Sequence, residues 1–202
     1  KHLSAKGSVM PTLVTDPAEL DSADPLAPSF PLNSARLVAR LTRGQTGSGM
    51  VAAILRPCEI RAFIELVKLN QGSLENVLLI GVDCHGAFGN VDYQIFVAQN
   101  QGTDALGTTL TFLDGIRKGD SSSWNGLQLA KACRACAHPT TASADLSIGL
   151  FGLDPDQGLL ALSNTPKGEG LLNRLNLPDA SNLKKRDEAL KLYQEVSRNS
   201  SN

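Results

Sequence analysis

Thiol chemistry in this chain comes from four cysteines, Cys58, Cys84, Cys133 and Cys136. Two of them follow apolar runs at similar junctions, in "AILRPCEIRAF" (53–63) and "LLIGVDCHGAF" (78–88). The other two form a C-R-A-C turn, a spacing that lets one tight turn present two thiolates to a metal or cluster. If all four converge, they make a Cys₄ site. Zinc and a [4Fe–4S] cluster both accept that ligand set, so ligand type alone leaves the choice open.

Other uses of the cysteines also stay open at this point. Structural zinc sites usually draw on two local pairs, whereas this chain offers one pair and two single cysteines. A thioredoxin-type dithiol opens a helix just after a strand, but here the segment before Cys133 is helix-like. Two disulfides would suit a shorter, secreted chain, and four ordinary buried cysteines are the plainest alternative. His85 is a further candidate ligand, although four thiolates already complete a site.

The elements around the first two cysteines predict how they are positioned. "MVAAIL" (50–55) and "NVLLIGVD" (76–83) are short apolar runs typical of buried strands. Between them, apolar residues at helical spacing predict a helix over 59–70, with a buried stripe of Ile60, Phe63, Ile64 and Val67. Strand, helix and strand form a βαβ unit, whose two strands are parallel. Their carboxyl ends share one edge of the sheet, so we expect both thiols to open onto one crevice there.

The fold class expected from these elements is α/β, with a mostly parallel or mixed sheet, a βαβ unit at 50–83 and a Cys-rich crevice at the strand C-terminal edge. We expect three regions: an extended leader over 1–35, an α/β domain over 36–175, and a polar helix and tail over 176–202. The Pro- and Asp-rich leader supports at most one helical turn, near Ala18–Leu20.

The remaining segments give further expectations. "SARLVARLTR" (34–43) predicts a helix capped by Ser34, with Leu37 and Leu41 on one face. "YQIFVAQN" and the segment 108–113 favour strands. "LQLAKACRACAHP" predicts a short helix that runs into a Cys-rich turn. "ADLSIGLFGLD" and "GLLALSN" predict two strands joined by a turn, and the tail predicts a polar helix with Leu190 and Tyr193 on one face.

Composition and charge exclude several classes of protein. The 202 residues carry a formal net charge of −1, so no broad basic surface for nucleic acid is indicated. No apolar run approaches the roughly 20 residues of a membrane helix. The opening "KHLSAKGS" has neither an initiator Met nor an apolar signal core, which indicates trimmed ends rather than a targeting peptide. We therefore expect a cytoplasmic protein.

Three motifs in order, "RPCEIRA", "GVDCHG" and "CRACAHPTTASADLSIGLFG", resemble the beta-subunit family of coenzyme deazaflavin-reducing hydrogenases and formate dehydrogenases. The resemblance spans roughly residues 50–170. It implies an iron–sulfur flavoprotein in which a [4Fe–4S] cluster, held by the four cysteines, lies next to FAD. It also implies catalytic or ferredoxin-like partner subunits, and deazaflavin or another two-electron acceptor. The resemblance thus favours an electron-transfer subunit, with a zinc-stabilised Cys₄ binding or scaffold module as the alternative.

Two departures from the family pattern concern its cofactors. The ferredoxin-like CxxCxxCxxxCP segment of many relatives is absent here, so further clusters would need other residues or a partner. No Gly-rich dinucleotide motif follows a strand either, because "GQTGSGMV" precedes one, so flavin binding is implied by the resemblance alone.

Several residues outside the cysteines are candidates for cofactor contacts. Arg56, Arg61 and Arg134 lie within three residues of a cysteine and could balance the negative charge of a cluster, or could be solvated surface arginines. In "NTPKGEG", Lys167 and Gly168 could present amides to a phosphate, or form a simple turn. Asp145 is as consistent with a cap or turn as with a site, and the sequence indicates no catalytic residue.

Overall fold

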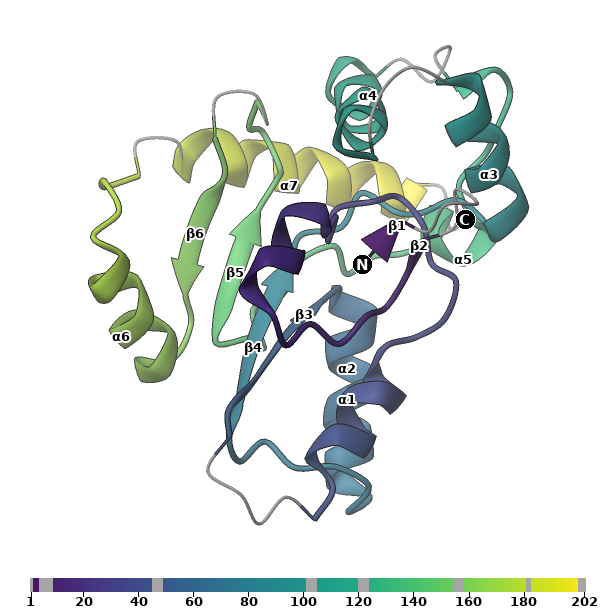
Figure 1. The fold of residues 1–202 in the computed structure, drawn as a ribbon. Helices are drawn as coiled ribbons and strands as arrows, with labels where there is room; N and C mark the ends of the chain where they lie inside the picture. Colours follow the sequence, from purple (N-terminus) through teal and green to yellow (C-terminus); the bar gives the residue numbers. More distant parts are fainter. Residues whose placement is uncertain are drawn as a thin grey trace. The chain divides into compact units, whose positions relative to one another are not determined.

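The computed structural model describes residues 2–3, 9–44, 49–100, 105–119, 124–154, 158–180 and 183–199 (Figure 1). The chain divides into two compact units that alternate along the sequence. Unit 1 contains residues 1–32 and 85–136, and unit 2 contains residues 33–84 and 137–200. The chain thus passes between the units directly after Leu32, Cys84 and Cys136.

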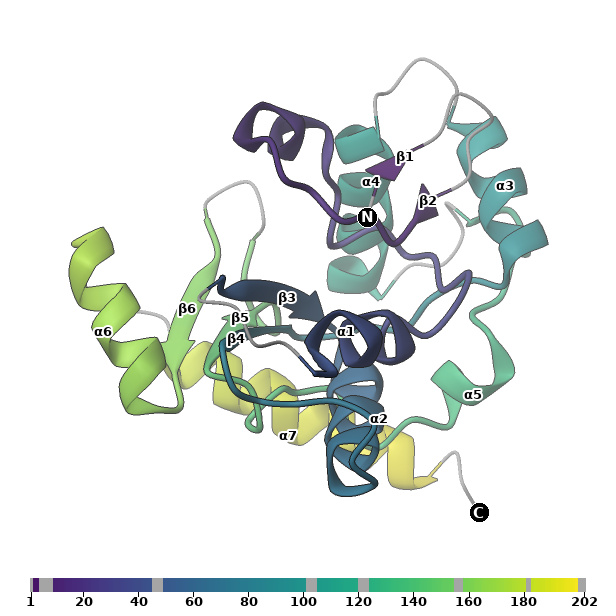
Figure 2. The ribbon, with the colours of Figure 1, turned by 60° about the horizontal axis from the view of Figure 1, so that its bottom comes forward.

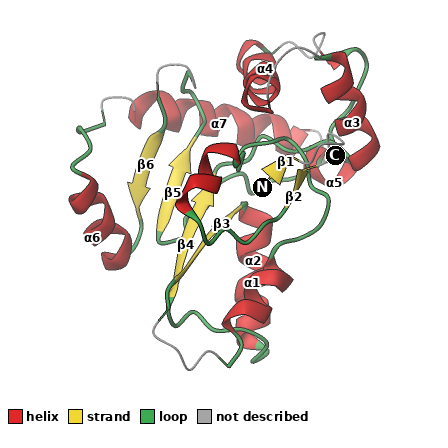
Figure 3. Cartoon of the chain, viewed as in Figure 1, coloured by secondary structure: helices red, strands yellow, loops and turns green. Residues whose placement is uncertain are grey.

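Unit 2 is built on a sheet of four strands, β3 (Val51–Leu55), β4 (Val77–Val82), β5 (Leu146–Gly149) and β6 (Leu160–Ser163). They lie side by side in the order β3-β4-β5-β6 (Figure 3). β3, β4 and β5 are parallel and β6 is antiparallel to β5. The predicted α/β class, the mixed sheet and the parallel neighbours β3 and β4 are therefore confirmed.

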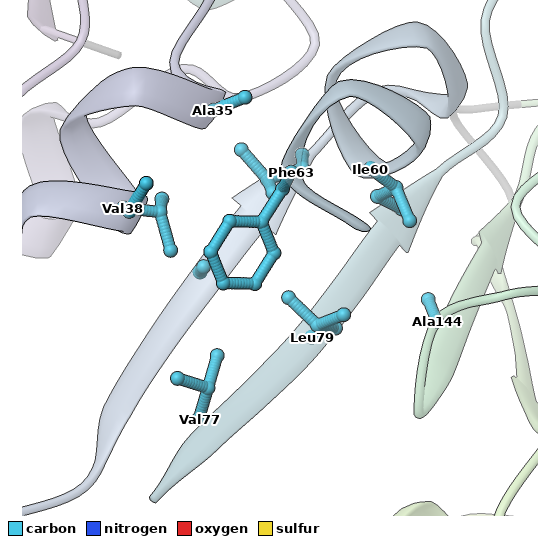
Figure 4. Close-up of a cluster of buried hydrophobic side chains, with 10 residues drawn as sticks. Ala35, Val38, Ile60, Phe63, Val77, Leu79 and Ala144 are labelled. Atoms are coloured by element: carbon cyan, nitrogen blue, oxygen red, sulfur yellow. The ribbon is translucent and has the colours of Figure 1, made fainter. Parts of the chain in front are cut away.

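Four helices belong to unit 2: α1 (Ala35–Thr42), α2 (Pro57–Lys68), α6 (Pro166–Leu175) and α7 (Leu183–Asn199). The main core lies where α1 and α2 meet β3 and β4, as Figure 4 shows around Phe63. Ile60 and Phe63 are almost fully buried there, and Ile64 and Val67 pack partly buried against the same cluster. The stripe predicted for this helix is confirmed, and each fully buried member contributes about 1.5–3 kcal/mol.

The helix predicted over 34–43 is confirmed as α1, but the face that carries Leu37 and Leu41 is not its buried face. Leu37 and Leu41 are 37% and 38% exposed, whereas Val38 and Ala39 are buried. This helix has two candidate apolar faces, one with Leu37 and Leu41 and one with Val38 and Ala39. The face with the smaller side chains packs on α2, because small side chains permit a closer approach of the two helices. The cap also differs: Ser34 makes no side-chain cap bond, and the backbone N–H of Ala35 donates instead to the side-chain oxygen of Asn33 at 2.9 Å.

Unit 1 contains the short antiparallel pair β1 (His2–Leu3) and β2 (Val9–Met10), the 3-10 helix η1 (Pro17–Ser22), and the helices α3 (Asn90–Gln99), α4 (Ala105–Lys118) and α5 (Lys131–Arg134). Its core is aromatic. Phe88 packs against Phe96, Phe112 and Trp124, with ring centroids 5.1 to 5.6 Å apart. The helical segment predicted near Ala18–Leu20 is present as η1, but its six residues exceed the one turn expected; Asp16 caps it.

Two strands predicted in unit 1 are wrong, because both segments are helical: "YQIFVAQN" lies in α3 and 108–113 in α4 (Figure 2). In α3 the apolar residues nearly alternate, which imitates a strand, but only Tyr93 and Phe96 are buried, at a spacing of three. In α4 the threonine-rich segment suggested β structure. Its hydroxyls are satisfied within the helical fold, since Thr109 donates to the buried Asp24 carboxylate and Thr111 to the Gly107 carbonyl.

The predicted end of the chain agrees with the structure. β5 and β6 match the two strands expected near 144–154 and 158–164. α7 is the polar helix, with Leu190 and Tyr193 partly buried. The rings of Tyr193 and Phe151 pack edge-to-face, with their centroids 5.2 Å apart. This contact packs α7 against the segment after β5.

Candidate cysteine site

Cys58 and Cys84 occupy equivalent places at the carboxyl ends of two paired strands. Leu55 of β3 is directly opposite Gly81 of β4, and each cysteine follows its strand residue by three positions. Both side chains are partly exposed. Cys58 lies in the first turn of α2, and the backbone N–H of Cys84 donates to the Pro139 carbonyl at 2.9 Å. Both cysteines therefore follow strands that end at the same edge of the sheet, and a shared crevice for their thiols stays a prediction.

The turn that carries Cys58 is fixed by a buried carboxylate. Glu59 is 1% exposed, and its two oxygens accept the backbone N–H groups of Arg56 at 3.0 Å and of Ser34 at 2.9 Å. These bonds join the start of α2 to the start of α1. A carboxylate that accepts backbone amides at a helix start satisfies donors that have no partner within the helix. The position of Cys58 is thus set by the packing of two helices.

The turn that carries Cys84 is fixed by an ion pair. Asp83 is buried, and both of its carboxylate oxygens lie within hydrogen-bond distance of the Arg186 guanidinium of α7, at 3.0 and 3.2 Å. It also accepts the backbone N–H of Leu150 at 3.2 Å. Burial raises the pKa of the Asp83 carboxyl above its ordinary value, while the charge of Arg186 opposes that rise. Asp83 therefore anchors the end of β4 to both β5 and α7.

Cys133 and Cys136 lie in unit 1, in and just after the four-residue helix α5. The N–H of Cys133 donates to the Ala130 carbonyl at 2.8 Å, and the N–H of Cys136 to the Cys133 carbonyl at 3.2 Å. This confirms the predicted short helix and Cys-rich turn. Gly86 passes close by with φ +105°, and a Cβ there would lie 2.8 Å from Leu129 and 3.4 Å from Cys133. A side chain at this position would push the turn away.

The donor set suits a thiolate-bound metal centre, since all four cysteines are thiols and none is deeply buried. Cys58 and Cys84 belong to unit 2, and Cys133 and Cys136 belong to unit 1. Within the described residues, no group of three or more His, Cys, Asp or Glu side chains comes together as a metal site. A single four-cysteine centre therefore stays a prediction.

The three arginines predicted near the cysteines differ in setting. Arg56 is 5% exposed, at the start of α2, whereas Arg61 is exposed one turn further along. Arg134 is exposed and donates to the side chain of Gln128 at 2.9 Å. His85, beside Cys84, is partly exposed. Of the three, Arg56 is the most desolvated, so its charge is the least screened.

Lys167 and Gly168 lie at the other end of the sheet. The Lys167 ammonium donates to the carbonyl of Val77, the first residue of β4, at 2.7 Å, so six strand residues, roughly 20 Å, separate it from the turn of Cys84. The N–H of Gly168 donates to the Thr165 hydroxyl, and a Cβ on Gly168 would overlap the Asp145 carbonyl. These contacts join α6 to the sheet, and a cofactor role for the two residues stays a prediction.

Asp145 is neither a simple cap nor a turn residue. Its carboxylate accepts the backbone N–H of Leu79 at 2.9 Å and the Thr165 hydroxyl at 2.7 Å. It thereby links β4 to the start of α6.

Sequence reasoning missed the pair Asp83–Arg186, whose members are 103 residues apart. An acid at a strand end directly before a cysteine, in "GVDCHG", is the signal that could have drawn attention to Asp83. Nothing local identifies its partner among the many basic residues of the tail.

The fold and the strand-end cysteines define the class: an α/β protein whose thiols stand at the carboxyl edge of a parallel pair. Residues 49–188 match the family described as the C terminus of the Coenzyme F420 hydrogenase/dehydrogenase beta subunit, and the chain belongs to this family. It is 25% identical over 159 residues to a protein of Methanocaldococcus jannaschii named F420-dependent formate dehydrogenase subunit beta. The match covers 72% of this chain and 41% of that relative. Among the described residues, no helix is long and apolar enough to cross a membrane.

Proposed function

We propose that this chain is the electron-transferring region of a redox beta subunit, in which Cys58, Cys84, Cys133 and Cys136 hold one [4Fe–4S] cluster beside FAD. The observation that carries the proposal is the family match over 49–188, which includes all four cysteines. The names of the family and of the relative support a partner of the formate dehydrogenase or hydrogenase type and F420, a deazaflavin, as the two-electron acceptor. FAD is supported by the resemblance alone.

Covalent connectivity supports one site for the two cysteine pairs. Cys84 donates its N–H to the Pro139 carbonyl, and Pro139 follows Cys136 by only three residues. Gly86, which closely approaches Cys133, follows Cys84 by two. Two or three residues span at most about 7–11 Å even when extended. The connections between the two pairs are therefore short along the chain, which supports one shared cluster.

The chain's own residues supply the surroundings that such a centre needs. A cluster transfers single electrons, and four thiolates give it net negative charge, which nearby cations and N–H donors stabilise. Arg56 is a buried cation two residues before Cys58. The bonds of Glu59 and Asp83 hold the turns of Cys58 and Cys84 in place. Fixed ligand positions favour one cluster geometry and limit rearrangement on electron transfer.

The test is metal and flavin analysis of anaerobically purified protein. We expect a brown protein with about four iron and four sulfide per chain, bleached by dithionite, that releases FAD on denaturation. A colourless protein with stoichiometric zinc would instead establish the structural Cys₄ module. Iron and sulfide without releasable flavin would support the cluster and remove FAD from the proposal.

Variants test whether the two pairs form one site. Cys84→Ser and Cys136→Ser take one ligand from each pair, and Ala135→Ser is the matched control in the same turn as Cys136. We expect both cysteine variants to lose most of their iron and the control to keep it. Loss of iron in only one of the two cysteine variants would show that the pairs do not share a cluster.

A further inference from the structure

A cavity of about 210 Å³ lies in unit 2, next to the turns that carry Cys58 and Cys84. One wall is the start of α2, through Pro57, Ile60 and Arg61. The opposite wall is the segment 137–143, and Gln194 of α7 adds a polar side chain. Ile60 is also part of the main apolar core, so this wall of the cavity is backed by the packed interior of unit 2.

The wall over 137–143 is held rigidly. The Pro139 carbonyl accepts the N–H of Cys84, and the Thr141 hydroxyl donates to the Ser147 hydroxyl at 2.9 Å. Asn164 donates to the same Ser147 oxygen at 2.8 Å. Thr141 also packs directly on Gly81, where any Cβ would overlap it. The cavity is therefore preformed, so a ligand would not have to order this wall on binding.

The groups that line the cavity favour an anion. Arg61 is cationic, His138 can donate through a ring nitrogen, and Thr140 and Ser143 offer hydroxyls. No carboxylate is among the described residues that line it. Arg61 forms no ion pair within the described part of the chain.

The neighbouring acids are already engaged elsewhere. Glu65, one turn beyond Arg61, pairs with Lys68 at 2.8 Å, and Asp145 bonds to Leu79 and Thr165. Glu59 bonds to the backbone at the start of α2. The positive end of the α2 dipole adds to the field of Arg61. Among the residues that the structure describes, no carboxylate therefore pairs with the Arg61 guanidinium.

The size of the cavity decides what kind of ligand it takes. Its volume is below the range of about 300–1,000 Å³ that is typical of pockets for drug-sized ligands. It is nevertheless larger than the volume that several water molecules occupy in the liquid, about 30 Å³ each. A whole dinucleotide does not fit, whereas a phosphate or carboxylate with a few attached atoms does. An arginine fork matches the paired oxygens of either group.

We propose that this cavity binds the phosphate or carboxylate group of a small anionic ligand through Arg61, with His138 and the hydroxyls of the 137–143 segment as further donors. The site adjoins Cys58 and Cys84, so the bound anion lies beside the proposed redox centre. Binding itself does not require that centre, and the two proposals can fail separately.

The test is calorimetric titration of the full chain, purified anaerobically, with inorganic phosphate and separately with acetate at constant ionic strength. We expect saturable binding of at least one of the two, and the tighter probe identifies phosphate or carboxylate as the preferred group. Arg61→Gln should weaken binding by about ten- to a hundredfold, the effect of losing charge-assisted hydrogen bonds. Arg61→Lys should restore part of the affinity.

Arg40→Gln is the matched control, since Arg40 is an exposed arginine of α1 in the same unit and does not line the cavity. Ala142→Phe fills the cavity from its exposed wall without removing charge, and should also weaken binding. Equal affinities in Arg61→Gln and Arg40→Gln, or no saturable binding of either anion by the unmodified chain, would overturn the proposal. Iron analysis of the same samples reports separately on the cluster.

Discussion

The two cysteine pairs are positioned in contrasting ways. Cys58 and Cys84 follow paired strands and are fixed by buried groups far apart in sequence, namely Glu59 and the pair Asp83–Arg186. Cys133 and Cys136 lie in and just after a four-residue helix with no buried residue; their N–H groups bond to residues three positions back, and the N–H of Ala130 bonds to the Ala87 carbonyl. The first pair therefore depends on the core of unit 2, and the second depends on short-range hydrogen bonds and on contacts with the segment 86–87 outside any buried core. Core substitutions should disturb the first pair most.

The largest effect is expected from Phe63→Ala. The side chain is 0% exposed at the centre of the cluster that holds α2 on the sheet, so its removal should destabilise the protein by about 3–5 kcal/mol. Urea denaturation measures this change. Leu69→Ala at the end of the same helix, 64% exposed, should stay within about 0.5 kcal/mol. Similar losses in both would mean that α2 is not held by this core.

Arg186→Leu should be nearly as severe, about 3–5 kcal/mol at neutral pH, because it leaves the buried Asp83 carboxylate without its counter-charge. The Asp83 side chain is 0% and that of Arg186 11% exposed, so solvent screens the pair little. Denaturation of Arg186→Leu and of the double variant with Asp83→Asn tests this. The double variant should be less destabilised than Arg186→Leu, and a double variant that is equally destabilised would contradict the pairing.

The same pair predicts a pH dependence. The folded-state pKa of Asp83 lies above its ordinary value, so the folded protein binds more protons than the unfolded chain between the two pKa values. The contribution of Asp83 to stability therefore falls as pH rises through that window. Arg186→Leu removes a group that lowers this pKa, so the window should extend to higher pH. Denaturation at several pH values should show the deficit of the variant growing as pH rises above about 4.

A smaller effect is expected from Gly81→Ala, about 1–3 kcal/mol, since the added Cβ would overlap Thr141 and push the 137–143 wall from β4. Gly170→Ala is the matched control, because no described atom lies within 4 Å of its added Cβ on exposed α6. It should instead stabilise the helix by about 0.5–1 kcal/mol. Thermal denaturation of both distinguishes crowding from a general intolerance of alanine.

The smallest effect should come from the other cysteine pair. Arg134→Ala removes only an exposed hydrogen bond to Gln128, and should change stability by less than about 0.5 kcal/mol. Iron content should also be unchanged, as metal analysis of the variant can check. A marked loss in either measurement would mean that the C-R-A-C turn is held by more than its local bonds, and the contrast between the pairs would weaken.

The segments that could be predicted were those whose apolar pattern had a single interpretation. β3 and β4 are short apolar runs and α2 carries one buried stripe, and their order alone implies a parallel pair with Cys58 and Cys84 at one edge. α3 and α4 were mistaken for strands because alternating apolar residues and clustered threonines imitate β structure. The helical form of α3 and α4 buries Phe96 and Phe112 against Phe88. Packing between segments far apart in the sequence produces no local pattern that sequence analysis could detect.

The sequence by itself determined the α/β class, the crossover between β3 and β4, and the local C-R-A-C turn, because these follow from apolar period, connection length and residue spacing. Only the tertiary structure decided which groups hold those turns in place. Arg186 bonds to Asp83, 103 residues before it in the chain, and Thr141 packs on Gly81, 60 residues before it. Contacts at such separations depend on the tertiary fold, and the sequence around each residue does not identify its partner.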